Sequence, residues 1–393
     1  MNYSHEVDGN LLTLLQYGTA YFPQLCADIE AAQHSIYLET YIFAADETGR
    51  MVADALQRAA GRGVSVRVLL DGYGSAELPR TWIDDMRTAG IEVQWFRREI
   101  SPFTLSRSRL RRLRRLHRKM VVLDGEIGFV GGINVIDDIP LHNKFSLPRL
   151  DYAVRIQGAV VGEIHMSMRQ LWSAVSWASI RMRGKRIERF IARKAREVIS
   201  SSITFLVRDN LRHRRDIERA YLNAIARAQH EVVIANAYFL PGHGFRQALV
   251  QAAQRNVRVV LLLQGRVEYR IQHYATHALY DQLLSAGIEI YEYQASYMHA
   301  KVAVVDGQWA TVGSSNIDPF SLLLARESNL AVQHAGFAKA LRNSLFEVID
   351  QDSLLIDPAQ WNNLGWGARF VARFSYAVLR MVMGVLGFGK RGE

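Results

Sequence analysis

The amino-acid sequence contains an internal duplication, and this feature restricts the possible fold more than any other. Each duplicated segment is a run of β-branched and apolar residues, and helix-forming stretches lie between the runs. Two chain halves with the same alternation of strand and helix predict two similar α/β units, each a mixed sheet with helices on both faces. The repeated pairs are 32–43 (AQHSIYLETYIF) with 228–239 (AQHEVVIANAYF), 62–72 (RGVSVRVLLDG) with 255–265 (RNVRVVLLLQG), and 89–96 (AGIEVQWF) with 286–293 (AGIEIYEY).

A polar motif belongs to the same duplication. Residues 116–134 (LHRKMVVLDGEIGFVGGIN) match residues 298–316 (MHAKVAVVDGQWATVGSSN) at an offset of 182 residues without a gap. The preceding repeat is offset by 197 residues, so the first half carries fifteen extra residues before its motif, in the basic stretch RREISPFTLSRSRLRRLRRL. The matched positions are His117, Lys119, Asp124, Gly131 and Asn134 in the first copy and His299, Lys301, Asp306, Gly313 and Asn316 in the second.

The spacing of the motif gathers several polar groups at one place. His117 and Lys119 are two residues apart on a strand, so their side chains share a face. Asp124 comes at the strand end before a glycine, which is more typical of a structural carboxylate than of a general base. The glycine-rich segment lets the backbone approach closely, so Asn134 can return an amide donor. The second copy adds the hydroxyl of Ser314 where the first has a glycine.

Duplication changes the interpretation of the histidines. A single histidine on a strand is usually a core residue, but two copies related by a pseudo-twofold axis place two imidazoles and two ammonium groups across one concave interface. The sequence offers no cluster of carboxylates or cysteines with metal-ligand spacing, and the lysines disfavour a bound cation. These groups therefore predict a phosphoryl-transfer site that requires neither a metal nor another cofactor.

Charge is concentrated in patches. Residues 97–119, 181–196 and 369–391 together carry a formal charge of +21, whereas the whole chain carries +10, so the remainder is acidic at −11. Such patches favour an anionic partner such as phosphate, nucleic acid or anionic lipid, and solvated charged surfaces are the alternative. The one cysteine, Cys26, excludes an intrachain disulfide and is typical of core filling.

The last segment, residues 366–393, has the pattern of an amphipathic helix. We expect it to lie in the plane of a membrane interface, and a terminal helix packed on the core is the alternative. No run of eighteen apolar residues occurs and the amino terminus has no signal pattern, so we expect no ordinary membrane-spanning helix. Helical spacing places Arg369, Arg373 and Arg380 on one face, opposite Phe370, Phe374, Met381 and Val385.

Both copies of the polar motif match the HKD motif of the phospholipase D superfamily, which is highly specific when it occurs twice. Beyond the motif, LETYIFAADETGRMVADALQRAAGRGVSVRVLLDGYGS, IANAYFLPG and HAKVAVVDGQWATVGSSNIDP resemble bacterial cardiolipin synthases, most of all the B type, across nearly the whole chain. The resemblance implies two phospholipase D-like halves. It also implies transphosphatidylation, in which a phosphatidyl group passes from one phospholipid to phosphatidylglycerol through a phosphatidyl-histidine and a headgroup is released.

The resemblance implies a role for each site residue. His117 is expected to be the nucleophile and His299 the acid and base. Glu327 and Asp151 correspond to carboxylates that orient the histidines, and an ordinary salt bridge is the alternative for both. The motif completes the catalytic set with Lys119, Asp124, Lys301 and Asp306, and charge on the phosphate would be stabilised by the lysines with Asn134, Asn316 and Ser314.

Domain boundaries and partners complete these expectations. We expect the first half at 1–180, a basic linker at 181–208, the second half at 209–360 and a membrane-associating tail at 361–393. Expected partners are phospholipids, with phosphatidylglycerol as acceptor and phosphatidylethanolamine as a further donor, and a membrane surface contacted through 366–391; no nucleic acid is expected. The expected location is peripheral, on the cytoplasmic face of the bacterial cell membrane.

Three other functions are compatible with parts of the sequence. A phospholipase D-type hydrolase differs only in its second nucleophile, which would be water. A nuclease of the superfamily fits the basic patches but not the amphipathic tail. A module that binds anionic lipid or nucleic acid without catalysis leaves the paired histidines and lysines without a role.

Overall fold

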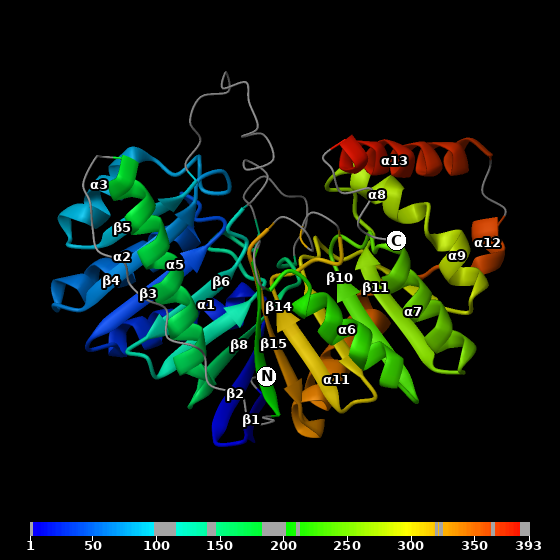
Figure 1. The fold of residues 1–393 in the computed structure, drawn as a ribbon, viewed down its shortest axis with the longest axis horizontal. Coiled ribbons are helices and arrows are strands. Elements are labelled where there is room, and N and C mark those ends of the chain that lie inside the picture. The colour runs from blue at the N-terminus through cyan, green and yellow to red at the C-terminus, as the bar shows by residue number, and fades with distance from the viewer. Residues whose placement is uncertain are drawn as a thin grey trace.

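A computed structural model of the chain describes residues 3–97, 115–139, 147–182, 202–209, 213–318, 321, 325–362 and 366–385. These residues form two α/β halves that lie side by side (Figure 1). The first half contains β1 (Tyr3–Val7), β2 (Asn10–Gln16), α1 (Tyr17–Ala31), β3 (Ser35–Thr40), α2 (Glu47–Gly61), β4 (Ser65–Asp71), α3 (Arg80–Thr88), β5 (Glu92–Phe96), β6 (Lys119–Leu123), β7 (Ile127–Gly131), β8 (Tyr152–Gln157) and α5 (Val160–Met182).

The second half repeats this order of elements and ends in additional helices. It contains β9 (Ile203–Arg208), α6 (Asp216–Arg227), β10 (Glu231–Asn236), α7 (His243–Gln254), β11 (Arg258–Gln264), α8 (Arg270–His277), α9 (Tyr280–Ser285), β12 (Glu289–Tyr293), β13 (Lys301–Val305), β14 (Trp309–Gly313), β15 (Glu327–Gln333), α11 (Ala335–Asp352), β16 (Ser353–Leu355), α12 (Pro358–Asn362) and α13 (Trp366–Val385).

The two sheets have the same topology. The first runs in the order β2-β8-β7-β6-β3-β4-β5, and the second in the order β9-β15-β14-β13-β10-β11-β12. β1 adds to the β2 edge of the first sheet, and β16 adds to the β12 edge of the second. In each sheet three strands are parallel and their neighbours are antiparallel, so the sheets are mixed. The expected fold of two similar halves is confirmed.

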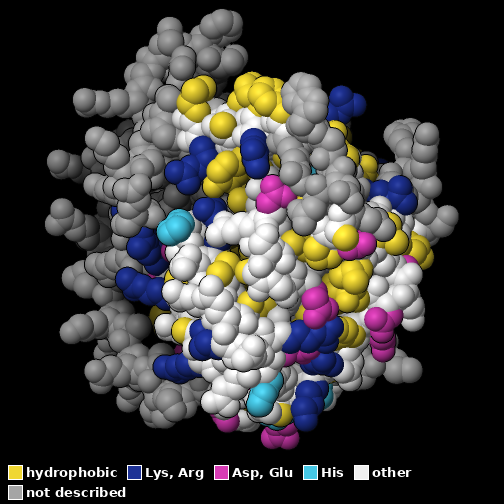
Figure 2. Space-filling view, turned by 90° about the vertical axis from the view of Figure 1, so that its right-hand side faces the viewer, with side chains coloured by type: hydrophobic (Ala, Val, Ile, Leu, Met, Phe, Trp, Pro, Cys, Tyr) yellow, Lys and Arg dark blue, Asp and Glu magenta, His cyan; other side chains and the backbone are white. Residues whose placement is uncertain are grey.

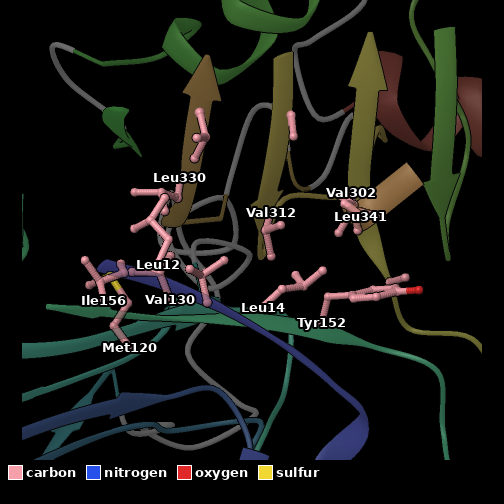
Figure 3. Close-up of a cluster of buried hydrophobic side chains, with 14 of the residues drawn as sticks. Leu12, Leu14, Met120, Val130, Tyr152, Ile156, Val302, Val312, Leu330 and Leu341 are labelled. Atoms are coloured by element: carbon pink, nitrogen blue, oxygen red, sulfur yellow. The ribbon is translucent and has the colours of Figure 1, made fainter. Parts of the chain in front are cut away.

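Alternation along the strands divides the core into three layers. Met120 and Val122 of β6 face a central cluster, whereas Val121 and Leu123 face a separate cluster under α1, α2 and α3. β13 repeats this division, and its outward residues meet a third cluster under α6, α7 and α9. The central cluster joins the two sheets, with apolar side chains of both interdigitating (Figure 3). Because this core is shared, the two halves form one packed unit.

The expected linker lies largely outside the described residues, which omit 183–201. β9 begins at Ile203, within the range expected for the linker, and pairs with β15 along its whole length. The second sheet therefore starts a few residues before the expected boundary at 209. The other domain boundaries stay predictions.

α13 lies across α8 on the second half (Figure 1). Its inner face carries Ala372 and Ser375, which are buried, and Arg246 donates a hydrogen bond to the hydroxyl of Tyr376 at 3.1 Å. Hence α13 packs on the core of the second half. This agrees with the alternative given for this segment in place of a helix that contacts only a membrane. No helix among the described residues is both long and apolar enough to cross a bilayer.

The outer face of α13 is nonetheless apolar. Phe370, Phe374 and Met381 are 60%, 59% and 66% exposed, and Figure 2 shows hydrophobic side chains along the upper rim of this face of the molecule. The two phenyl rings stack with their centroids 6.0 Å apart. Exposed Arg373 lies near Asp281 at the side of the helix, with 3.7 Å between Nη2 and Oδ2. The helix therefore has a buried face opposite the aromatic residues, where the sequence pattern predicts arginines, and Arg373 and Arg380 flank the apolar face.

The two DG turns of the duplicated motif are structural. Asp124 adopts a positive φ of 53°, and Asp306 one of 52°, each followed by a glycine that is also in the left-handed region. The carboxylate of Asp124 accepts hydrogen bonds from the backbone N–H groups of Gln33, His34 and Ser35, at 2.7–2.8 Å. Asp306 binds the equivalent groups of residues 229–231 at 2.8–2.9 Å. Each aspartate thus ties the β6–β7 or β13–β14 turn to the start of the adjacent strand.

Substitution of either aspartate should destabilise the fold. Asp124→Ala and Asp306→Ala each remove the acceptor of three backbone N–H groups, and we expect an apparent loss on the order of 1–3 kcal/mol in the free energy of unfolding. Urea unfolding followed by circular dichroism measures this loss. Glu126→Ala, at an exposed position of the same turn, is the matched control and should change stability by less than about 0.5 kcal/mol. Equal stability of the Asp124→Ala and Glu126→Ala proteins would contradict the structural role.

Candidate active site between the two halves

The two motif histidines meet at the boundary between the halves. His117 lies two residues before β6 and His299 two residues before β13. The centroids of their rings are 6.5 Å apart with an interplanar angle of 63°. Their side chains are largely buried, at 15% and 12% exposure. The duplication predicted two imidazoles facing one another across the interface, and the structure places them so.

Each imidazole is held by a carboxylate of the opposite half. Nδ1 of His117 is hydrogen-bonded to Oε2 of Glu327, at the start of β15, at 3.1 Å. Nδ1 of His299 lies 2.7 Å from Oδ2 of Asp151, immediately before β8. The sequence indicated both carboxylates but not this crossed pairing. Nδ1 of each ring is engaged, and neither Nε2 has a hydrogen-bond partner among the described residues, so both Nε2 atoms are available to a substrate.

Backbone hydrogen bonds cross the interface in the same way. The N–H of His117 donates to the carbonyl of Arg326 at 2.9 Å, and the N–H of His299 donates to the carbonyl of Leu150 at 2.7 Å. These contacts are part of two isolated parallel bridges, Leu116 with Arg326 and Leu150 with Met298. The segment that carries each histidine is thereby fixed to the segment that carries its carboxylate.

Two further residues, which the sequence pattern did not indicate, position the histidine segments. Oδ2 of Asp71, at the end of β4, accepts the N–H of Leu116 at 2.7 Å. Oε1 of Gln264, at the end of β11, accepts the N–H of Met298 at 2.9 Å. Their signal was present in the repeat, because LLDG in the first half matches LLQG in the second.

Both lysines are buried beside the histidines. Lys119 is 3% exposed and Lys301 is fully buried. Nζ of Lys119 donates to the carbonyl of His117 at 2.7 Å, and Nζ of Lys301 donates to the carbonyl of His299. Removal from water lowers the pKa of Lys119 to about 7 and that of Lys301 to about 8. The site therefore holds two cations that a phosphate anion would stabilise.

Burial also controls the protonation of the histidines. It lowers the pKa of His117, although the charge of Glu327 opposes this effect, and it lowers the pKa of His299 well below its usual value, helped by both lysines. Burial raises the pKa of Asp151 to about 7. His117 is consequently neutral at pH 7, as a nucleophile requires, and the Asp151–His299 pair retains a proton at higher pH than the histidine alone would.

The carboxylates have different surroundings in the two halves. The hydroxyl of Ser314 donates to Oε2 of Glu327 at 2.6 Å and accepts the N–H of Ser328 at 3.0 Å. We expected Ser314 to bind phosphate, but its hydroxyl is engaged by this carboxylate. Gly132 takes its place in the first half, where an added Cβ would lie 2.3 Å from Oδ1 of Asp151. The glycine is required because the shorter aspartate occupies that space.

The remaining predicted residues divide into two groups. Asn134 and Asn316 are buried. Oδ1 of Asn134 accepts the N–H of Ile42 at 3.2 Å, which leaves its Nδ2 as a donor. Asp124 and Asp306 complete the motif and were included in the catalytic set, but they lie at the far ends of β6 and β13, about 16 Å along the strand from the lysines. Their carboxylates bind backbone instead.

The described residues contain no group of three or more His, Cys, Asp or Glu side chains arranged to hold a metal ion. Most of the basic segments 97–119 and 181–196 lies outside the described residues, which omit 98–114 and 183–201.

Known protein families match both halves of the chain. A family model described as "Cardiolipin synthase, PLD-like domain" matches residues 25–144 and 221–348. Cardiolipin synthase B of Escherichia coli strain K12 is 37% identical over 361 residues, which cover 91% of this chain and 85% of that protein. Cardiolipin synthase B of Salmonella typhimurium is 38% identical over 359 residues, with 91% and 85% coverage.

A solved structure is similar in fold. The phosphatidylserine synthase of Haemophilus influenzae has a TM-score of 0.69 at 13% identity, and the match covers 99% of this chain and 96% of that one. At this identity the likeness supports the fold alone. The sequence relatives and the family model decide the family: the chain belongs to the cardiolipin synthase family of phospholipase D-like proteins.

Proposed function

We propose that the protein is a cardiolipin synthase that transfers a phosphatidyl group from one phospholipid to phosphatidylglycerol and releases a headgroup. The observation that carries the proposal is the pair of imidazoles 6.5 Å apart, each held at Nδ1 by a carboxylate of the other half. Such a pair can act on one phosphorus from two sides. The relatives named cardiolipin synthase B match along 91% of the chain, which includes both motifs.

The first chemical step forms a covalent intermediate. Nε2 of His117 attacks the phosphorus of the donor lipid, a P–N bond forms, and the bond from phosphorus to the headgroup oxygen breaks. His299 gives that oxygen a proton, so the headgroup leaves as a neutral alcohol. Glu327 stabilises the positive charge that develops on the His117 ring.

The second step reverses the roles. A glycerol hydroxyl of phosphatidylglycerol attacks the phosphorus, the P–N bond breaks, and the hydroxyl proton passes to His299. Cardiolipin leaves, and both histidines return to their starting states. Lys119 and Lys301 hold the non-bridging oxygens, with the amides of Asn134 and Asn316 as neutral donors. In phospholipase D-type hydrolysis, water would replace the glycerol hydroxyl.

We infer that the enzyme meets its lipids at the bilayer surface through residues 366–391. The exposed apolar face of α13 suits insertion at the headgroup boundary, and the flanking Arg373 and Arg380 suit anionic phosphates. We propose that the enzyme is a peripheral protein on the cytoplasmic face, because anionic lipids there attract basic segments. Phosphatidylglycerol is the acceptor in this proposal, and phosphatidylethanolamine is a further candidate donor. Nucleic acid is not a substrate in this proposal.

Loss of either histidine should abolish synthesis. His117→Ala removes the nucleophile and His299→Ala removes the acid and base, so cardiolipin formation from labelled phosphatidylglycerol in mixed micelles should fall by about a thousandfold or more. Thin-layer chromatography separates the products. Appreciable cardiolipin from either folded variant would refute the two-histidine scheme.

The rate should depend on pH through the buried lysines. The pKa values of Lys119 and Lys301 lie at about 7 and 8 in the free enzyme, so kcat/KM should decrease as pH rises through this range and both cations are lost. Bound phosphate favours the charged lysines, so the decrease in kcat should occur at higher pH. The acid limb of kcat/KM should lie below pH 6.5, because the pKa of His117 is lowered. Coincident alkaline limbs of kcat and kcat/KM above pH 9 would contradict this account.

The apolar face of α13 should determine membrane binding. Replacement of Phe370, Phe374 and Met381 together by serine should weaken cosedimentation with phosphatidylglycerol-containing vesicles by at least about tenfold, because apolar area that inserts into the interface is lost. These side chains are exposed, so the fold should survive. Deletion of the whole helix would instead expose the surface of the second half that α13 covers. A matched triple substitution to serine on α2, at exposed Glu47 and Asp54 and half-buried Gln57, should leave binding unchanged. Equal binding of both variants would exclude α13 as the contact.

A further inference from the structure

The surroundings of the two catalytic histidines differ at one duplicated position. The ring of Tyr41 packs on His117 with centroids 4.8 Å apart, and Nζ of Lys119 lies 5.4 Å from the centre of the same ring. In the repeat, Tyr41 corresponds to Ala237. The N–H of Ala237 donates to the carbonyl of Ala300 at 3.0 Å, so this alanine lies next to the His299 segment. The aromatic cover beside His117 is thus replaced by a methyl group beside His299.

A pocket opens at this alanine. It is formed by the carboxyl ends of β10 and β11 together with α8. Ends of parallel strands in α/β sheets are common places for ligands. Gln264, which lines the pocket, holds the N–H of Met298 immediately before His299. The pocket is therefore linked to the segment of the second histidine through Gln264, and neither lysine of the site lines it.

The geometry of phosphoryl transfer assigns this side a role. In an in-line displacement the attacking and leaving atoms lie on opposite sides of the phosphorus. If His117 is the nucleophile, the headgroup oxygen must lie on the His299 side, where Ala237 leaves room. We propose that the pocket is the alcohol subsite, which binds the leaving headgroup in the first step and the attacking glycerol headgroup in the second. This inference rests on the proposed transphosphatidylase function.

The polar groups of the pocket favour a polyol. Nε2 of Gln264 is a buried donor without a partner among the described residues. Glu268 is an acceptor, which receives the hydroxyl of Tyr238 at Oε2 with a distance of 2.7 Å. A hydroxyl can accept from the first group and donate to the second, whereas an ammonium only donates and would leave Gln264 unpaired. The rings of Tyr238 and Tyr269, with centroids 5.9 Å apart, offer an apolar surface to the carbon skeleton. The predicted ligand is the glycerol headgroup.

The subsite should control which alcohol receives the phosphatidyl group. Purified full-length protein in phosphatidylglycerol micelles is given deuterated glycerol and ethanolamine at equal concentrations, and mass spectrometry measures the ratio of the two new lipids. The ratio compares two fates of one intermediate, so it does not depend on the rate of the first step. We expect the wild type to favour glycerol by at least about tenfold. Gln264→Glu replaces the donor Nε2 by an acceptor and keeps an oxygen for the N–H of Met298, so it should reduce this preference by about tenfold. Glu126→Gln, in the exposed β6–β7 turn, is the matched control and should keep the wild-type ratio.

A second variant tests the space itself. Ala237→Tyr introduces the side chain that the first half carries at this position. It should increase the share of phosphatidic acid, the product of water, relative to glycerol transfer by about tenfold, because water still fits the narrowed pocket. Circular dichroism checks the fold, and Gln264→Glu decides alone if Ala237→Tyr does not fold.

The outcomes separate this inference from the proposed function. If the wild type makes neither cardiolipin nor any alcohol-exchange product, the transphosphatidylase proposal fails and the subsite fails with it. If the wild type makes cardiolipin but the folded variants keep its product ratios, the subsite alone is wrong. A wild-type preference for ethanolamine would overturn the glycerol assignment.

Discussion

The crossed hydrogen bonds between imidazoles and carboxylates are the interaction on which the active site depends. Glu327 holds His117 and Asp151 holds His299, each across the boundary between the halves. A hydrogen bond of this kind is effective only if both sides are fixed to within a fraction of an ångström. The backbone bridges beside each histidine, and the apolar core that joins the two sheets below it, supply that fixation. The packing of the two halves against one another therefore also fixes the catalytic geometry.

The active site holds several charged groups in a buried environment, where the charged forms are less stable than in water. Two lysines and two carboxylates are almost completely buried, and each finds a hydrogen-bond partner in the backbone or in a histidine. Burial lowers the pKa of both lysines, which means that the empty site tolerates their cations poorly. A phosphate diester brings the missing negative charge, and still more negative charge develops on its oxygens in the transition state. The cost of burying the cations is thus offset where catalysis gains most.

The repeat allowed much of this to be predicted from sequence. Strand and helix periodicity, present twice, indicated two mixed sheets, and the spacing of His117 and Lys119 placed them on one face. The crossing of the carboxylates was not predictable, because a linear pattern shows the interval from His299 to Glu327 but not which side of a pseudo-twofold axis the side chain reaches. Ser314 was misjudged for a related reason: a hydroxyl in a glycine-rich turn can face phosphate or a neighbouring carboxylate, and only packing decides. Asp71 and Gln264 occupy matching positions at the ends of β4 and β11, so the repeat did mark them. A polar residue at a strand end can have many roles, however, and the sequence alone does not select one.

The reciprocal placement of the orienting groups has a bearing on how such a chain could arise. Each half carries a histidine that it cannot orient and a carboxylate that serves only its neighbour, so a half on its own would be an incomplete enzyme. Two identical copies of one half would nevertheless satisfy each other, because the relation between them is symmetric. Fusion of such a pair into one polypeptide frees the copies to diverge. Tyr41 against Ala237, and Gly132 against Ser314, are the kind of difference that an obligatory symmetric dimer could never acquire.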